Sequence, residues 1–123
     1  MKRLFIILLG LILWTCTSQE EKTTGEVQLL NKVQFTEAIS GDVLLVDVRT
    51  SAEYDQGFIE GAVNIDFKKS DFEKRMSHFD REMPVAVYCA KGGRSAGAGK
   101  KLQEMGFAKV YDLKGGYTGW TTE

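Results

Sequence analysis

The chain has 123 residues, which is enough for one domain of moderate size. Hydrophobic residues make up 43% and charged residues 27% of it, a balance that excludes an intrinsically disordered chain. The formal net charge is −1, from 16 basic and 17 acidic residues, and the lysines are scattered along the sequence. We therefore expect a globular protein that does not bind nucleic acid.

The first 15 residues have the pattern of a signal peptide. Lys2 and Arg3 give a positive start, and an apolar run extends from Leu4 to Trp14. Such a run is too short to span a bilayer comfortably and is typical of the hydrophobic region of an export signal. We therefore predict that residues 1–15 direct export. The polar and charged residues 16–26 are predicted to form a flexible tether.

Cys16 stands directly after this segment, where bacterial lipoproteins carry their lipid. Leu13 occupies the third position before it, as in a lipobox, whereas Trp14 and Thr15 replace the small residues usually found there. The resemblance implies a lipid anchor on Cys16 and a membrane-tethered protein of the periplasm or cell envelope. Cleavage by an ordinary signal peptidase and an uncleaved anchor are the alternatives.

Residues 27–123 are predicted to form one domain in which strands and helices alternate. Apolar and β-branched runs predict strands at 27–30, 43–48, 62–65, 85–88 and 110–113. Apolar spacing and capping residues predict helical segments at 33–39, 52–56 after an N-cap at Ser51, 70–78 capped by Ser70 or Asp71, and 94–105. A final turn opens at Gly115. This alternation predicts a parallel α/β sheet with ligands at the carboxyl ends of its strands.

The strongest functional signal follows the predicted strand 85–88. Cys89 ends that strand and is followed by a short loop that leads directly into a helix, made of Ala90, Lys91, Gly92, Gly93, Arg94 and Ser95. Backbone N–H groups and a helix N-terminus then face the sulfur and form an anion site. A thiolate held there has a lowered pKa and is a nucleophile at neutral pH. A cysteine that only packs needs neither two glycines nor two cations beside it, so we predict a reactive thiol.

Several segments, in this order, resemble the rhodanese (sulfurtransferase) homology domain. They are Val46–Arg49 with Glu53 and Tyr54, Gly57–Asn64, Tyr88–Ser95, Leu102–Phe107, and Leu113–Tyr117 with Trp120. The resemblance covers nearly the whole predicted domain and implies an α/β fold, a parallel β-sheet flanked by α-helices on both faces. Phe58 stands where the family usually has a histidine. We expect the replacement to keep the packing and to lose a hydrogen bond.

The resemblance also implies covalent sulfur transfer through Cys89. The thiolate would attack the outer sulfur of a donor such as thiosulfate and become a persulfide, which an acceptor thiol or cyanide would then discharge. The loop would bind the donor: Gly92 and Gly93 would let the N–H groups converge, and Lys91 and Arg94 would add positive charge. Ser95 would cap the helix or donate a hydrogen bond to the sulfur.

Loop length separates two chemistries that the fold supports. Four residues lie between Cys89 and Arg94, whereas the related phosphatases have five and a wider cradle. The shorter loop favours sulfur over phosphate and disfavours a phosphatase or arsenate reductase. A sensor module in which Cys89 is oxidised or persulfidated as a signal would use the same residues, so this alternative stays open.

Other polar residues are predicted to support the site rather than to react. Asp47, Arg49 and Glu53 are expected to form a structural ion pair that braces the loop. His78 is the only histidine and is predicted to lie on the surface. We predict no metal, because the chain has no metal-ligand spacing of His and Cys, and we also predict no cofactor. We also expect a monomer.

Two further expectations concern packing. Gly97 and Gly99 fall inside the predicted helix 94–105, where each costs roughly 1 kcal/mol relative to alanine. We expect them where the helix approaches the sheet closely. Tyr117 and Trp120 are predicted to pack in the core and at its rim. We predict no disulfide, because one cysteine lies at the membrane edge and the other ends a core strand.

Overall fold

The computed structural model describes residues 26–122. The predicted signal peptide, the predicted lipid site at Cys16 and nearly all of the predicted tether lie outside these residues, so they stay predictions. Between residues 26 and 122, no helix is both long enough and apolar enough to cross a membrane.

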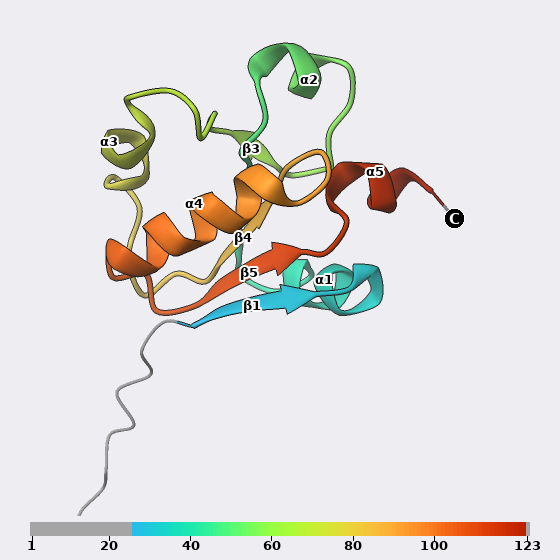
Figure 1. Cartoon of the computed structure of the whole chain (residues 1–123). Coiled ribbons are helices and arrows are strands. Elements are labelled where there is room, and N and C mark those ends of the chain that lie inside the picture. Colours follow the sequence, from blue (N-terminus) through green and yellow to red (C-terminus); the bar gives the residue numbers. More distant parts are fainter. Residues whose placement is uncertain (1–25, 123) are drawn as a thin grey trace, which may run out of the picture.

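The described residues alternate strands and helices along the chain (Figure 1). The strands are β1 (Val27–Leu30), β2 (Leu44–Asp47), β3 (Val63–Asn64), β4 (Val85–Tyr88) and β5 (Val110–Leu113). The helices are α1 (Lys32–Ile39), α2 (Ser51–Asp55), α3 (Phe72–Met76), α4 (Gly93–Glu104) and α5 (Gly116–Thr121). The five strands form one parallel sheet in the order β1-β5-β4-β2-β3. The predicted α/β fold with a parallel sheet is therefore confirmed.

Helices cover both faces of the sheet (Figure 1). Alternate residues of the central strand β4 face opposite layers. Val85, Val87 and Cys89 belong to the cluster that packs under α3 and α4. Ala86 and Tyr88 belong to the other cluster, together with residues of α1 and partly buried side chains of α2 and α5. Burial on both faces explains why β4 has no polar alternation in its sequence.

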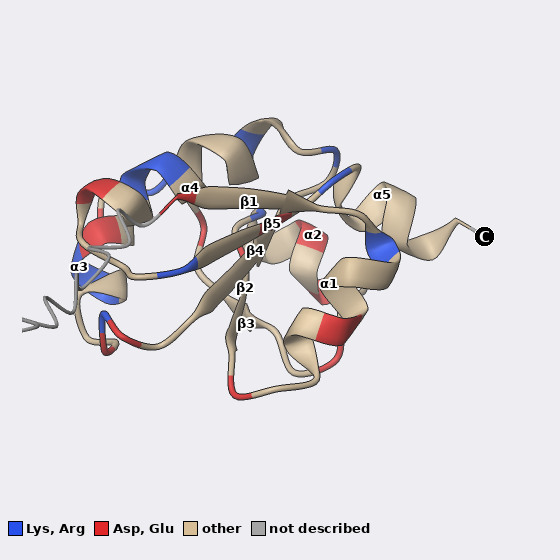
Figure 2. Cartoon of the chain, turned by 90° about the horizontal axis from the view of Figure 1, so that it is seen from below, with Lys and Arg blue, Asp and Glu red and all other residues tan. Residues whose placement is uncertain are grey.

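Charged residues are absent from the central strand β4 and occur mostly on the helices and loops. Figure 2 shows basic and acidic segments of the ribbon alternating around the described part of the chain. The β4 residues are all apolar or aromatic and are fully buried. The interior charged residues are few, and each of them lies near the carboxyl ends of the strands, where the site is found.

Helix α4 packs directly on the edge of the sheet at Gly99. A Cβ atom there would lie 3.1 Å from Cγ1 of Val27 and 3.7 Å from Cγ1 of Val110. Gly97 admits a different neighbour, because a Cβ atom would lie 2.9 Å from the ring of Phe67. The expected close approach to the sheet is thus confirmed for Gly99, whereas Gly97 makes room for an aromatic ring that follows β3.

The predicted N-cap of α2 and the predicted length of α3 are wrong. The N-cap of α2 is Thr50 and not Ser51, because Glu53 reaches back and completes a reciprocal capping box. The Thr50 hydroxyl accepts from the Glu53 N–H at 3.2 Å. Helix α3 is shorter than the predicted 70–78, and Asp71 stands at its N-cap without a side-chain hydrogen bond.

The start of α5 is pressed against the loop after Cys89. The backbone φ of Gly116 is +57°, and a Cβ atom there would lie 2.5 Å from the carbonyl oxygen of Cys89. The N–H of Tyr117 donates to that oxygen at 2.7 Å, and the N–H of Thr118 donates to the carbonyl oxygen of Ala90 at 3.0 Å. The first turn of α5 therefore fixes two carbonyl groups of the loop.

The first prediction concerns this contact. Gly116→Ala should lower the free energy of unfolding by at least about 2 kcal/mol more than Gly106→Ala. Both glycines have positive φ, but a Cβ at Gly106 would meet nothing within 4 Å, so only the backbone strain is shared. Urea denaturation of the two variants measures the difference. Equal losses would show that α5 does not press on the loop.

Candidate active site

Cys89 lies at the carboxyl end of β4 as a free thiol and is only 1% exposed. Gly92, at the N-cap of α4, has a φ of +117°, a conformation that favours glycine. Its N–H donates to Sγ of Cys89 at 3.0 Å. The Ser95 hydroxyl oxygen lies 3.5 Å from the same sulfur. The predicted order of strand, cysteine, tight loop and helix N-terminus is therefore present around the thiol.

The pKa of the Cys89 thiol reflects two opposing effects. Burial raises the pKa, because the thiolate loses its hydration. Hydrogen bonding by the Ser95 hydroxyl and by the N–H groups of Ser95, Gly92 and Lys91 lowers it and outweighs burial. The pKa of Cys89 consequently lies below its ordinary value, and the protein's own dipoles stabilise the thiolate.

Arg94 is held by a carboxylate from α2. Its Nη1 lies 2.6 Å from Oε1 of Glu53, and its Nη2 lies 3.0 Å from Oε2, so the pair is bidentate. The pKa of Glu53 falls to about 2, chiefly because of the hydrogen bond from Arg94, while partial burial opposes the shift. Arg94 also interacts electrostatically with Cys89. Both terminal nitrogens of Arg94 are thus paired with Glu53, and binding of the donor by Arg94 stays a prediction.

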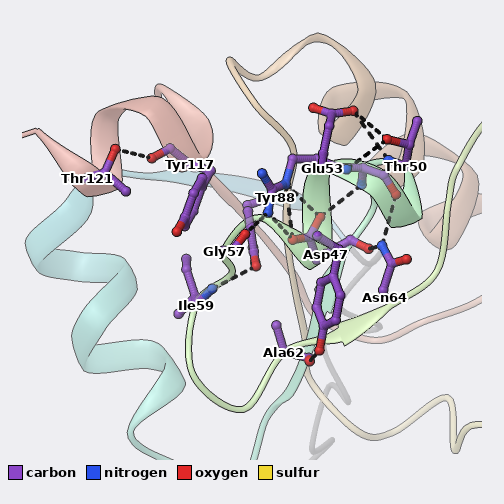
Figure 3. A network of polar contacts seen from close by, with 12 residues as sticks. Asp47, Thr50, Glu53, Gly57, Ile59, Ala62, Asn64, Tyr88, Tyr117 and Thr121 are labelled. Carbon is purple, nitrogen blue, oxygen red and sulfur yellow. Dashed lines mark hydrogen bonds and ion pairs between the residues drawn. The ribbon is translucent and has the colours of Figure 1, made fainter.

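The buried ion pair joins Asp47 and Arg49, with Nη2 2.7 Å from Oδ2. Nη2 of Arg49 also donates to the carbonyl oxygen of Gly57 at 2.7 Å, and its guanidinium lies 4.3 Å from the ring centre of Tyr117. Figure 3 shows this network from close by, with Asp47, Gly57 and Tyr117 around it. The structural pair of Asp47 and Arg49 is as predicted, and Glu53 also forms an ion pair that braces the loop, with Arg94 as its partner rather than Arg49.

Lys91 is the exposed cation of the loop. Within residues 26–122, no carboxylate forms an ion pair with it. Arg49 and Arg94, by contrast, are each matched by an acidic partner. Lys91 therefore has a positive charge available to an incoming anion, beside the start of α4.

Two other residues singled out from the sequence, Phe58 and His78, lie away from the thiol loop's hydrogen bonds. Phe58 is 45% exposed and stacks on Tyr54, with ring centres 4.1 Å apart and planes 11° apart. The replacement of the family's histidine thus keeps aromatic packing. His78 is exposed, and its Nδ1 lies 2.8 Å from the carbonyl oxygen of Lys74, away from the loop.

Sequence reasoning missed Asp112 on β5. Its carboxyl group is buried on the α4 side of the sheet, with 4% of the residue exposed. An acidic residue inside a predicted core strand is a signal in itself, because aspartate is rarely buried without a partner. Over the described part of the chain, no group of three or more His, Cys, Asp or Glu residues could hold a metal ion.

The fold and the site define an α/β protein with a buried cysteine, surrounded by hydrogen-bond donors, at the carboxyl edge of a parallel sheet. The sequence matches the rhodanese-like domain family over residues 31–123, and the chain belongs to that family. A sulfurtransferase of Allochromatium vinosum is 39% identical over 79 residues, which cover 64% of this chain and 72% of that protein. Thiosulfate sulfurtransferase GlpE of Shewanella oneidensis is 37% identical over 92 residues, which cover 72% of this chain and 83% of that protein.

A solved structure agrees with the family assignment. The rhodanese-related protein of Thermoplasma volcanium superposes with a TM-score of 0.67 at 30% sequence identity. The superposition covers 76% of this chain and 89% of that one. The likeness therefore includes most of residues 26–122 and the element order that places Cys89.

The second prediction concerns the pair of Glu53 and Arg94. The pKa of Glu53 is about 2 in the folded protein against an ordinary 4.5, so its carboxylate stabilises the fold above pH 4.5 and loses this effect as the pH falls toward 2. Because the pair is partly exposed, Glu53→Gln should cost only about 1 kcal/mol at pH 7. Urea denaturation should show this difference vanishing near pH 2.

Glu104→Gln is the matched control, because Glu104 is an exposed partner of Lys101 at 3.7 Å. It should change the free energy of unfolding by less than about 0.5 kcal/mol at any pH. A loss in Glu53→Gln that is the same at pH 7 and at pH 2 would show that the charge of Glu53 does not stabilise the fold.

Proposed function

We propose that the protein is a sulfurtransferase that carries sulfane sulfur on Cys89. The observation that carries the proposal is the buried Sγ atom with the Gly92 N–H at 3.0 Å and the Ser95 hydroxyl at 3.5 Å. A loop with four residues between Cys89 and Arg94 supports a sulfur atom as the group transferred. The names of the relatives from A. vinosum and S. oneidensis support the same class of reaction.

In the first half-reaction the Cys89 thiolate attacks the outer sulfur of a donor such as thiosulfate. A sulfur–sulfur bond forms to Cys89 as the sulfur–sulfur bond of thiosulfate breaks, and sulfite leaves with the electron pair. The negative charge moves from Sγ to the terminal sulfur of the persulfide. The hydrogen-bond donors at the start of α4 are already in position, so they stabilise this charge without reorganisation.

In the second half-reaction an acceptor thiolate or cyanide attacks the terminal sulfur. The bond to Sγ breaks, its electron pair returns to Cys89, and a new persulfide or thiocyanate leaves. The thiolate is thereby regenerated, so no cofactor is needed to balance the cycle. Burial of Cys89 shields the thiolate and the persulfide from water between the two steps.

Turnover is the test of this proposal. The full chain in detergent should form thiocyanate from thiosulfate and cyanide over many cycles, and Cys89→Ser should form none. Cys16→Ser is the matched control, because it makes the same substitution at the other cysteine and should retain full activity. Turnover in folded Cys89→Ser would overturn the proposal, and so would Cys89-dependent hydrolysis of a phosphate ester without sulfur transfer. Uptake of sulfur without turnover would favour a sensing role.

The proposal assigns recognition of an anionic donor to Lys91. Lys91→Gln should raise KM for thiosulfate about fivefold, equivalent to about 1 kcal/mol for a partly solvated charge pair, and should change kcat less than twofold. Lys100→Gln, on an exposed position of α4, is the matched control and should leave KM unchanged. Equal KM values for Lys91→Gln and the wild type would show that the donor does not use this charge.

A further inference from the structure

The buried carboxyl group of Asp112 has no role in the reaction described so far. Only 4% of the residue is exposed, and its Oδ1 atom has no hydrogen-bond partner among the residues that the structure describes. A buried polar atom without a partner costs free energy and requires an explanation. The surroundings of Asp112 supply one.

The strand register places Asp112 on the same face as Cys89. Asp112 pairs with Val87 of β4, and Cys89 follows Val87 by two residues, so their side chains point to the same side of the sheet. Val110, two residues before Asp112, faces Gly99 of α4. Asp112 therefore lies under α4, one step nearer to the carboxyl ends of the strands.

Ser95 is the α4 residue that faces Asp112. It precedes Gly99 by four residues, just over one turn or about 6 Å of helix, and Asp112 follows Val110 by about 6.6 Å of strand. Because β4 and β5 are parallel, the helix between them runs in the opposite direction, so these two advances bring Ser95 over Asp112. The pKa of Asp112 agrees: burial raises it, and hydrogen bonding by the Ser95 side chain partly opposes the rise.

Ser95 has a single hydroxyl proton and several acceptors around it. Its Oγ atom lies 3.2 Å from the carbonyl oxygen of Gly92 and 3.5 Å from the sulfur of Cys89, and the residue is fully buried. An ionised Asp112 would be a further acceptor and would draw that proton away from the sulfur. A protonated Asp112 would instead donate to Oγ, so that only the carbonyl oxygen of Gly92, to which the hydroxyl donates in the structure, competes with the thiolate for the hydroxyl proton.

We propose that Asp112 is a positioning residue that stays protonated and donates a hydrogen bond to Ser95 Oγ, so that the Ser95 hydroxyl points at the sulfur of Cys89. These two hydrogen bonds would link Asp112 on β5, Ser95 on α4 and Cys89 at the end of β4. This proposal rests on the proposed function only in that Cys89 is the nucleophile. Its consequence for the thiol can be measured without any sulfur donor.

The test is the pH dependence of alkylation of Cys89 by iodoacetamide in the full chain. Trypsin releases the peptide Glu82–Lys91, which contains Cys89 and not Cys16, so mass spectrometry reads the correct thiol. Asp112→Val removes the donor and should raise the apparent thiol pKa by about 1 unit. Asp112→Asn keeps an N–H donor of similar shape and should leave the thiol pKa near that of the wild type.

A Ser95→Ala background shows whether the effect passes through Ser95. Asp112→Val should cause no further shift of the thiol pKa there, because the link to the sulfur is already absent. The other charged groups at the site are the same in every variant: Lys91 on the loop, Arg94 with its partner Glu53, and Asp66, which also interacts electrostatically with Arg94. Differences between variants therefore report on Asp112 and Ser95 alone.

Three outcomes would overturn the proposal. Asp112→Asn could raise the thiol pKa as much as Asp112→Val, Asp112→Val could leave it unchanged, or its effect could persist in the Ser95→Ala background. If Asp112→Val does not fold, infrared difference spectra between the wild type and Asp112→Asn at neutral pH decide the matter. A carboxylic-acid C=O band that is lost in Asp112→Asn supports the proposal, and a carboxylate band overturns it. None of these measurements uses thiosulfate, so a failure of sulfur transfer is recorded separately.

Discussion

An anionic sulfur loses its hydration when it is buried, and other hydrogen-bond donors must replace the water. Cys89 is 1% exposed, and the donors that face it come from the loop and the first turn of α4. This turn can lie over the thiol because α4 packs closely on the sheet at Gly99. The first turn of α5 holds the other side of the loop through the carbonyl group of Cys89. The fold around the site thus serves one requirement, which is to hold donors against a buried anion.

The three cations at the site divide into two that hold the structure and one that faces solvent. Arg49 and Arg94 are both matched by carboxylates, so they fix the segments around the loop. Lys91 has no such partner among the described residues and lies exposed beside the thiol. The Ser95 hydroxyl and backbone N–H groups lower the pKa of Cys89 against the effect of burial, and the exposed lysine is available for an anionic donor. The two tasks are therefore separated in space and can be altered independently.

The sequence predicted the features that depend on local pattern. The alternation of strands and helices predicted the parallel sheet. The buried run at 85–88 and the glycines after Cys89 predicted the position of the thiol. It could not show that Glu53 would reach Arg94, because the two residues are 41 positions apart and several acidic residues were available. The Glu53 carboxylate also completes the capping box with Thr50, so the N-cap of α2 is Thr50 and not the predicted Ser51. Asp112 was missed because the role proposed for it depends on Ser95. Only the packing of α4 on β5 brings Ser95 close to Asp112.

The most direct measurement is mass spectrometry of the Cys89 peptide after the full chain has reacted with thiosulfate and any free thiol has been blocked. The account predicts that the peptide Glu82–Lys91 gains one sulfur atom, and that treatment with cyanide before digestion removes it and forms an equal amount of thiocyanate. A peptide that gains no sulfur, from folded and reduced protein, would contradict the claim that Cys89 accepts sulfur from thiosulfate. Sulfur found only on another residue would contradict the assignment of Cys89 as the carrier.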